Sequence, residues 1–204
     1  MKFSYMVIAG PQAAGKTTII TFIKKDNRNI FPLREARDIV NSKYKFKGAI
    51  SMTTSDEIEA IELDIDRMKS IEDRLKNDPS SIYLDECNLF TLAHASMRGI
   101  STGKHLINYC QRLTRLNPLI IFLDSAPKNS WIRRKNAYNA RLNELSPHDK
   151  EKALYEYKRY MDGVYPRLKA LYQEISLPKI YVPSLGSLLN SVLVTSWKSI
   201  WRYN

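Results

Sequence analysis

The chain has 204 residues, of which 44% are hydrophobic and 26% are charged, and its 32 Lys and Arg residues against 21 Asp and Glu residues give a net charge of +11. This composition is typical of a globular domain and excludes the disordered, collagen-like and miniprotein classes. No apolar stretch approaches the roughly 20 residues of a membrane span. We therefore expect one domain over residues 1–204, in a cytoplasmic protein.

The positive charge is distributed unevenly along the chain. Residues 24–47 contain eight basic and three acidic side chains, whereas residues 53–86 contain eleven acidic and four basic ones. A second basic segment spans residues 128–159. Such segregation favours an anionic partner, which could be a nucleotide phosphate, a nucleic acid or a membrane surface, although a merely solvated basic surface has the same pattern.

Short apolar runs alternate with an amphipathic segment in the first half of the chain. Residues 3–9 form a short run rich in apolar, aromatic and β-branched side chains that ends at Gly10, which predicts a buried strand, a loop and then a helix from about Lys16. Residues 54–57 have the capping-box pattern, and apolar side chains then recur at three- and four-residue steps, which predicts an amphipathic helix. Residues 81–85 form a further apolar run that ends in an aspartate, as is typical of a buried parallel strand.

The second half of the chain repeats this alternation. Residues 119–124 form another apolar run that ends in an aspartate. An apolar stripe over residues 154–175 predicts a long helix that starts near Pro147, and we expect it to be kinked or broken near Gly163 and Pro166. A last strand over residues 179–182 precedes a C-terminal helix. This order predicts an α/β fold with a central parallel sheet, helices on both faces and ligands at the carboxyl edge of the strands.

The segment from Gly10 to Thr17 carries the most specific motif of the chain. It reads GPQAAGKT and fits G-x-x-x-x-G-K-[ST], between a predicted strand and a predicted helix. The loop's N–H groups would surround the phosphates of ATP, Lys16 would reach the β- and γ-phosphates, and the Thr17 hydroxyl would bind Mg²⁺. We therefore expect a P-loop NTPase, a three-layer sandwich with ATP and Mg²⁺ as cofactors. The residues expected to bind the nucleotide are Gly10, Ala13, Ala14, Gly15, Lys16, Thr17 and Thr18.

The run Ile82-Tyr-Leu-Asp85-Glu86 has two interpretations. As a Walker B strand, Asp85 would hold Mg²⁺ and Glu86 would activate water, as in P-loop ATPases. Alternatively, Asp85 would face the acceptor pocket of a small-molecule kinase. The run by itself leaves both interpretations open.

At these residues the chain resembles the P-loop nucleoside and nucleotide kinases, a family that includes thymidylate kinase, deoxynucleoside kinases and ribosylnicotinamide kinase. The segment Asp85-Glu-Cys-Asn-Leu-Phe-Thr-Leu-Ala-His94 is similar to one that begins with an Asp-Arg pair in the family, with Glu86 here in place of the usual Arg. The segment from Phe122 to Arg134 is similar to the strand and helix that lead into the family's lid. The resemblance implies a helical lid over about residues 128–150, with Arg133 on the transferring phosphoryl group and Arg134, Lys135 and Arg141 as its companions.

The same resemblance extends to the acceptor side of the site. The segment Pro32-Leu-Arg34-Glu35-Ala-Arg37-Asp38 is similar to the region after the family's second strand, where a Glu or Arg touches the acceptor. The resemblance implies that Glu35 accepts the proton of the acceptor hydroxyl and that Arg34 or Arg37 binds an anionic group of the acceptor. It also implies that Glu86 lies near the substrate. Arginines suit a nucleoside monophosphate, whereas Glu35 alone would suffice for an uncharged nucleoside. Residues 182–185 lie where the family binds adenine.

The first functional hypothesis is an ATP- and Mg²⁺-dependent phosphotransferase for a small nucleoside- or nucleotide-type acceptor. Its catalytic residues would be Lys16, Arg133, Asp85 and Glu35, with Thr17 and Asp85 at the metal. The alternatives are a P-loop ATPase that uses Asp85 and Glu86 to drive a nucleic-acid or protein partner, and a kinase for polynucleotide ends. We expect no membrane partner, and the resemblance implies a homodimer through the helix that contains residues 100–116.

Overall fold

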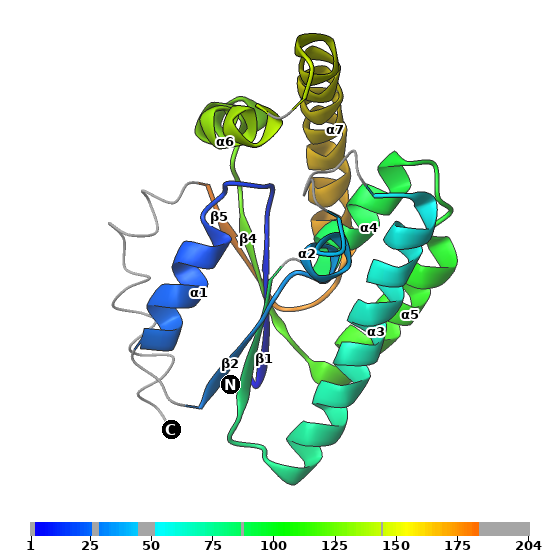
Figure 1. The fold of residues 1–204 in the computed structure, drawn as a ribbon. Helices are drawn as coiled ribbons and strands as arrows, with labels where there is room; N and C mark the ends of the chain where they lie inside the picture. The colour runs from blue at the N-terminus through cyan, green and yellow to red at the C-terminus, as the bar shows by residue number, and fades with distance from the viewer. Residues whose placement is uncertain (1–2, 26–28, 45–51, 87, 144, 184–204) are drawn as a thin grey trace.

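The computed structural model describes residues 3–25, 29–44, 52–86, 88–143 and 145–183 (Figure 1). Strands and helices alternate along the described chain, as the sequence predicts. The C-terminal helix expected after residue 182 lies outside the described residues, as do residues 184 and 185 of the segment 182–185. The strands are β1 (Tyr5–Ala9), β2 (Ile30–Leu33), β3 (Ile82–Glu86), β4 (Leu119–Leu123) and β5 (Lys179–Val182), and the helices are α1 (Lys16–Lys25), α2 (Ala36–Asn41), α3 (Thr54–Asn77), α4 (Asn88–Met97), α5 (Gly103–Leu116), α6 (Pro127–Leu142) and α7 (Pro147–Glu174).

The five described strands form one sheet in the order β2-β3-β1-β4-β5, and every neighbouring pair is parallel. Strand β1 lies in the middle, so that Val7 is level with Asp85 of β3 and with Ile120 of β4. Because all strands run the same way, their carboxyl ends share one edge of the sheet. That edge holds the loop after β1, the end of β3 and the segment after β2.

The sheet is covered by helices on both faces, which makes three layers (Figure 1). Alternate residues of a strand point to opposite faces. Tyr5 and Val7 of β1 face the larger core, which includes side chains of α3, α4, α5 and α7, whereas Met6 and Ile8 face the core that includes Ile19, Ile20 and Ile23 of α1. The structure therefore confirms the predicted α/β fold of the P-loop NTPase type.

Two local expectations change in the structure. Helix α3 is capped one residue earlier than expected, because the Thr53 side chain accepts from the Asp56 N–H and the Asp56 side chain accepts from the Thr53 N–H. Of the kink or break expected in α7, the break does not occur, because the helix continues through Gly163 and Pro166. Packing explains this continuity, because residues 164 and 168 are fully buried and the bare Gly163 lies against the Met97 thioether of α4.

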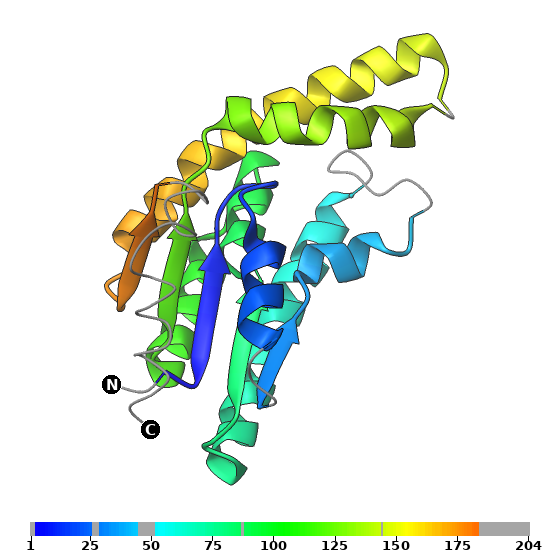
Figure 2. The ribbon, with the colours of Figure 1, turned by 90° about the vertical axis from the view of Figure 1, so that its left-hand side faces the viewer.

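Helices α6 and α7 form a hairpin at the carboxyl edge of the sheet, and α7 extends beyond the body of the molecule (Figure 2). Trp131 of α6 packs on Tyr157 of α7 with ring centroids 5.7 Å apart. The buried side chains of Leu142, Ala153 and Met161 join the same cluster. The expected lid segment of about residues 128–150 therefore corresponds to α6, its connection and the start of α7.

None of the described helices is long and apolar enough to cross a membrane.

The close approach of Gly10 to β4 gives a stability prediction. Gly10 has a φ of +148°, and a Cβ there would lie 2.5 Å from the backbone oxygen of Leu123. Gly10→Ala should lower the free energy of unfolding by about 2 kcal/mol or more, because strained backbone and displaced strands both cost energy. Urea denaturation measures the change.

Gly103→Ala is the matched control. Gly103 lies at the start of α5, and a Cβ there meets nothing within 4 Å. Alanine should leave stability unchanged or raise it by up to about 1 kcal/mol, because glycine is the weaker helix former. Equal stability of the two variants would contradict the close approach at Gly10.

Candidate functional site

The loop between β1 and α1 is wound around the side chain of Lys16. Gly10, Ala13 and Gly15 all have positive φ angles, of 148°, 59° and 98°. The buried Lys16 ammonium donates to the carbonyl oxygens of Gly10 and Pro11 at 3.1 and 3.0 Å. The structure thus holds a cation inside the loop, where the N–H groups at the start of α1 would meet a phosphate.

Thr17 and Glu86 contact each other at the start of α1. The Thr17 hydroxyl donates to Glu86 Oε1 over 2.9 Å. A hydroxyl and one carboxylate fit Mg²⁺, which takes oxygen ligands and is usually held by one or two carboxylates together with substrate phosphates. The described residues contain no group of three or more His, Cys, Asp or Glu side chains that could hold a metal by themselves. The donor set therefore suits a metal that arrives with the nucleotide.

Asp85 occupies a different environment from Glu86, although the two are adjacent. Its carboxylate is fully buried and accepts from Tyr5 Oη at 2.5 Å, from Arg67 Nη2 at 3.0 Å and from Asn88 Nδ2 at 3.4 Å. Burial raises the pKa of Asp85, while the charge of Arg67 opposes that rise. The structure does not bring Asp85 to Thr17, where the sequence analysis had placed it as a metal ligand.

The alternation of side chains along β3 accounts for this separation. Asp85 is level with Val7 and points to the face covered by α3 and α4, whereas Glu86 is level with Ile8, which faces α1. Thr17 belongs to α1, so the second acid of the pair meets it. The alternation of side chains along β1 and β3 could have been seen in the sequence, and it separates Asp85 from Glu86. The motif by itself does not show which of these two acids faces α1.

Glu35 lies at the N-cap position of α2 and is 8% exposed. Burial raises the pKa of Glu35 to about 7, although the positive charges of Lys16 and Arg37 oppose this change. The segment that carries Glu35 is tied down by Arg67, whose Nη1 donates to the Arg34 carbonyl at 2.7 Å. The side chain of Arg34 is exposed.

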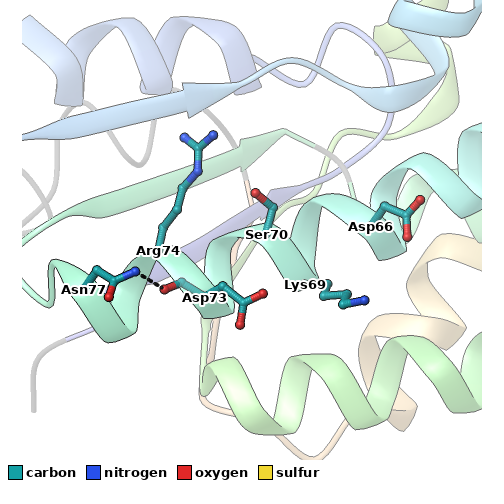
Figure 3. Close-up of a pocket in the computed structure, with 6 residues that line it drawn as sticks. All are labelled: Asp66, Lys69, Ser70, Asp73, Arg74 and Asn77. Carbon is teal, nitrogen blue, oxygen red and sulfur yellow. Dashed lines mark hydrogen bonds between the residues drawn. The ribbon is translucent and has the colours of Figure 1, made fainter.

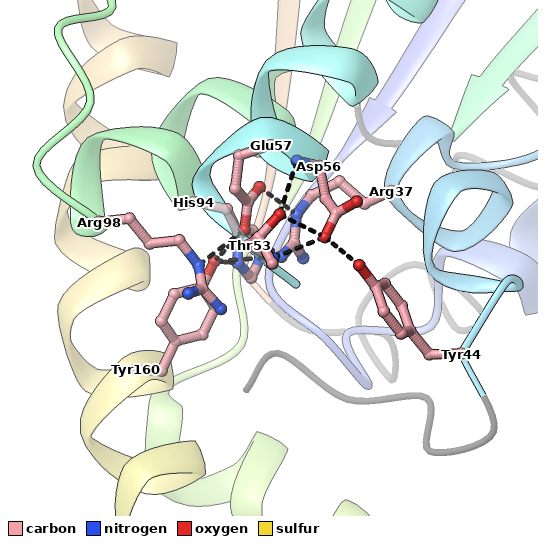
Figure 4. Close-up of polar contacts among 8 residues, drawn as sticks. All are labelled: Arg37, Tyr44, Thr53, Asp56, Glu57, His94, Arg98 and Tyr160. Carbon is pink, nitrogen blue, oxygen red and sulfur yellow. Dashed lines mark hydrogen bonds and ion pairs between the residues drawn. The ribbon is translucent and has the colours of Figure 1, made fainter. Parts of the chain in front are cut away.

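Arg37 is part of a buried ion-pair cluster (Figure 4). Its Nε and Nη2 donate to the two carboxylate oxygens of Glu57 at 2.9 and 2.7 Å, and Nη2 is 3.3 Å from Tyr160 Oη. Arg98, in the turn directly after α4, donates to the same carboxylate at 3.0 Å. Arg37 stands in a segment that the resemblance singles out, whereas Glu57, Arg98 and Tyr160 could not be found from the sequence, because they come from separate elements and no linear spacing relates them.

The α6–α7 hairpin touches the phosphate loop at two points. Arg133 Nη1 donates to the carbonyl oxygen of Ala13 at 2.8 Å, and Tyr157 Oη donates to Gln12 Oε1 at 2.7 Å. Arg133 therefore lies beside the loop, as the resemblance implied, and Tyr157 is a contact that the sequence analysis missed. Arg134 is half-buried on α6, and the side chain of Arg141 lies outside the described part of the chain.

A separate depression of about 360 Å³ lies along the C-terminal half of α3 (Figure 3). The end of α3 leads into the start of β3, so this depression lies toward the amino edge of the sheet, away from the phosphate loop. No residue of the loop or of the Glu35 segment lines it, and we assign it no role. Its lining residues are Asp66, Lys69, Ser70, Asp73, Arg74 and Asn77.

Comparison with known proteins shows a likeness in fold. No family model and no curated protein sequence matches the chain. Among solved structures, deoxyadenosine kinase from M. mycoides with the products dCMP and dCDP matches 96% of this chain and 99% of its own, at 13% identity and a TM-score of 0.56. The same enzyme with bound dCTP matches at 15% identity, equal coverage and a TM-score of 0.56, and with bound dATP it matches 88% of this chain and 90% of its own at 14% identity and a TM-score of 0.51. The chain therefore has the fold of the P-loop deoxynucleoside kinases over nearly its whole length.

Proposed function

We propose that the protein is a phosphotransferase that uses ATP and Mg²⁺ to phosphorylate a hydroxyl group of a nucleoside- or nucleotide-type acceptor. The observation that carries this proposal is the arrangement around the phosphate loop. Lys16 lies inside the loop, Arg133 contacts it from α6, and Glu35 is close enough to Lys16 and Glu86 for their charges to change its pKa. Lys16 and Arg133, which would bind the phosphates, thus lie at the same edge of the sheet as the Glu35 carboxyl, which would bind the acceptor.

Each group has a defined task in the transfer. Lys16 and Arg133 stabilise the negative charge that builds on the γ-phosphate oxygens, because guanidinium and ammonium groups in a dry site interact strongly with it. Mg²⁺, held by Thr17 and Glu86 together with the phosphates, would supply further neutralisation. Glu35 accepts the proton of the acceptor hydroxyl. The hydroxyl oxygen then forms a bond to the γ-phosphorus while the bond between the γ-phosphorus and the leaving ADP oxygen breaks.

The likeness to deoxyadenosine kinase supports a nucleoside-type acceptor, since that enzyme was solved with deoxynucleotides bound. The structure gives the ATPase alternative less support. In that hypothesis Asp85 holds the metal, but its carboxylate is fully buried among Tyr5, Arg67 and Asn88.

Product analysis tests the proposal against its alternatives. The protein is incubated with ATP, Mg²⁺ and pooled nucleosides and nucleotides, and separately with single- and double-stranded nucleic acid. A phosphorylated small molecule together with ADP is the expected result. Free phosphate whose release depends on nucleic acid would favour an ATPase, and a phosphorylated strand end would favour a polynucleotide kinase.

Removal of the Lys16 charge should slow the transfer strongly with little change in folding. Lys16→Met keeps the length of the side chain, so we expect kcat to fall by about 10² to 10³, the usual loss for one preorganised charge or donor at the transition state. Coupled ADP release measures kcat. Lys24→Met, at an exposed position of the same helix, should keep the parent rate; an equal loss in both variants would contradict the assigned role.

The raised pKa of Glu35 predicts a pH profile. With a pKa of about 7 the carboxyl becomes a base only as the pH rises through 7, so kcat/KM for the acceptor should increase from pH 6 to pH 8 and then level off. Glu35→Gln should remove this rise and lower kcat by roughly 10²-fold. A profile that keeps its inflection in Glu35→Gln would assign the titration to another group.

The same shift has a consequence for stability. A carboxyl whose pKa is higher in the folded chain costs stability as the pH rises from its ordinary 4.5 to about 7, because the unfolded chain ionises first. Glu35→Gln should therefore be at least as stable as the parent at pH 8 in thermal denaturation. Asp38→Asn is the control, because Asp38 raises the pKa of Glu35 by its charge alone; it should move the inflection to lower pH and keep the activity.

A further inference from the structure

The α6–α7 hairpin is bonded to two adjacent residues of the phosphate loop. Tyr157 Oη of α7 donates to Gln12 Oε1 at 2.7 Å. Arg133 Nη1 of α6 donates to the carbonyl oxygen of Ala13 at 2.8 Å. Each helix of the hairpin therefore holds one residue of the loop, and the two held residues are neighbours in the chain.

The two contacts are connected through the interior of the hairpin. Tyr157 is 3% exposed, and its ring packs on that of Trp131 with the centroids 5.7 Å apart. Trp131 precedes Arg133 by two residues on α6, and further buried side chains of both helices belong to the same cluster. Because the buried ring is held by its neighbours, its hydroxyl has a fixed direction. The bond from Tyr157 to the loop thus also fixes the place of α6.

The loop gains stability from these bonds. Gln12 occupies a variable position of G-x-x-x-x-G-K-[ST], so phosphate binding by the motif does not require a glutamine there. Ala13 has a φ of 59°, a conformation that a residue with a Cβ keeps only when its surroundings hold it. Hydrogen bonds from the hairpin to both residues contribute to that hold.

Arg133 depends on such support more than a buried side chain would. It is exposed and long, so fixing it in one conformation costs side-chain entropy. A displacement of about 1 Å from the productive position can cost about 10²-fold in rate, even when the responsible change lies outside the reacting groups. A rigid contact between the hairpin and the loop reduces that displacement.

We propose that Tyr157 is a positioning residue, whose hydrogen bond to Gln12 seats the α6–α7 hairpin on the phosphate loop and so places Arg133 at the γ-phosphate of bound ATP. This inference rests on the proposed function and adds a residue to its site. Tyr157 touches neither the γ-phosphate nor the acceptor in this arrangement. It acts through Arg133.

Tyr157→Phe tests the hydroxyl alone, because phenylalanine keeps the ring that packs on Trp131. We expect kcat to fall about tenfold, the effect of one lost hydrogen bond together with a misplaced arginine. KM for the acceptor should stay within about twofold, since the hairpin contacts the loop and not the Glu35 segment. Tyr155→Phe is the matched control, because Tyr155 is 65% exposed on the same helix and should keep the parent rate. An unchanged kcat in Tyr157→Phe would overturn the inference.

A double-mutant cycle separates positioning from a merely structural role. In the Arg133→Gln background, Tyr157→Phe should lower kcat by about twofold or less, because the group that it positions is already gone. Gln12→Ala should reproduce the loss of Tyr157→Phe, and the combination of the two should be no worse than either alone. Losses that multiply in either cycle would show that Tyr157 acts independently of Arg133 or of Gln12, and would overturn the inference.

Nucleotide binding distinguishes failure of this inference from failure of the proposed function. If no acceptor is phosphorylated, the same variants are compared by calorimetry with Mg²⁺ and a non-hydrolysable ATP analogue. Weaker binding in Tyr157→Phe that disappears in the Arg133→Gln background supports the positioning contact, and only the proposed function then fails. Equal binding by the parent and Tyr157→Phe, or losses that multiply, would overturn the inference in that case.

Discussion

A fully buried carboxylate at the end of β3 holds the carboxyl edge of the sheet together. Asp85 joins Tyr5 of β1, Arg67 of α3 and Asn88 of α4 through its two oxygens. Loss of one charged partner from such a buried pair leaves an uncompensated charge and costs about 3–5 kcal/mol. Arg67 also holds the Arg34 carbonyl, so the same guanidinium fixes the segment that carries the proposed base.

The position of Asp85 decides what its neighbours can do. Since adjacent strand residues face opposite ways, a buried Asp85 turns Glu86 toward α1 and the Thr17 hydroxyl. Glu35 lies at the N-cap position of the short helix α2, and Arg37 lies in the first turn of that helix. The hairpin of α6 and α7 contacts the phosphate loop through Arg133. A few tertiary contacts thus bring residues from distant parts of the chain to one edge.

Much of this architecture could be predicted from local patterns. Strand β1, the phosphate loop and α1 follow from an apolar run, two glycines and a lysine in adjacent positions, because this chemistry is built by consecutive residues. The alternation of strands and helices indicates a parallel sheet, because two parallel strands must be joined by a crossover connection, which is usually a helix. The sequence suggested a kink or a break in α7, and no break occurs, because packing of Gly163 and its neighbours on α4 outweighs the helix-breaking tendency of Pro166.

By itself, the sequence determined the P-loop fold and the place of Lys16 and Thr17, while the position of Arg133 beside the loop was implied by the resemblance to the kinase family. Only the tertiary structure decided which acid of the Asp85-Glu86 pair reaches Thr17, and that Arg37 pairs with Glu57 beside Arg98. The reason is physical. A motif of consecutive residues is set by backbone geometry, whereas the partner of a buried charge is chosen by whichever residues the packed helices bring within a few ångströms, and their separation along the chain contains no record of that contact.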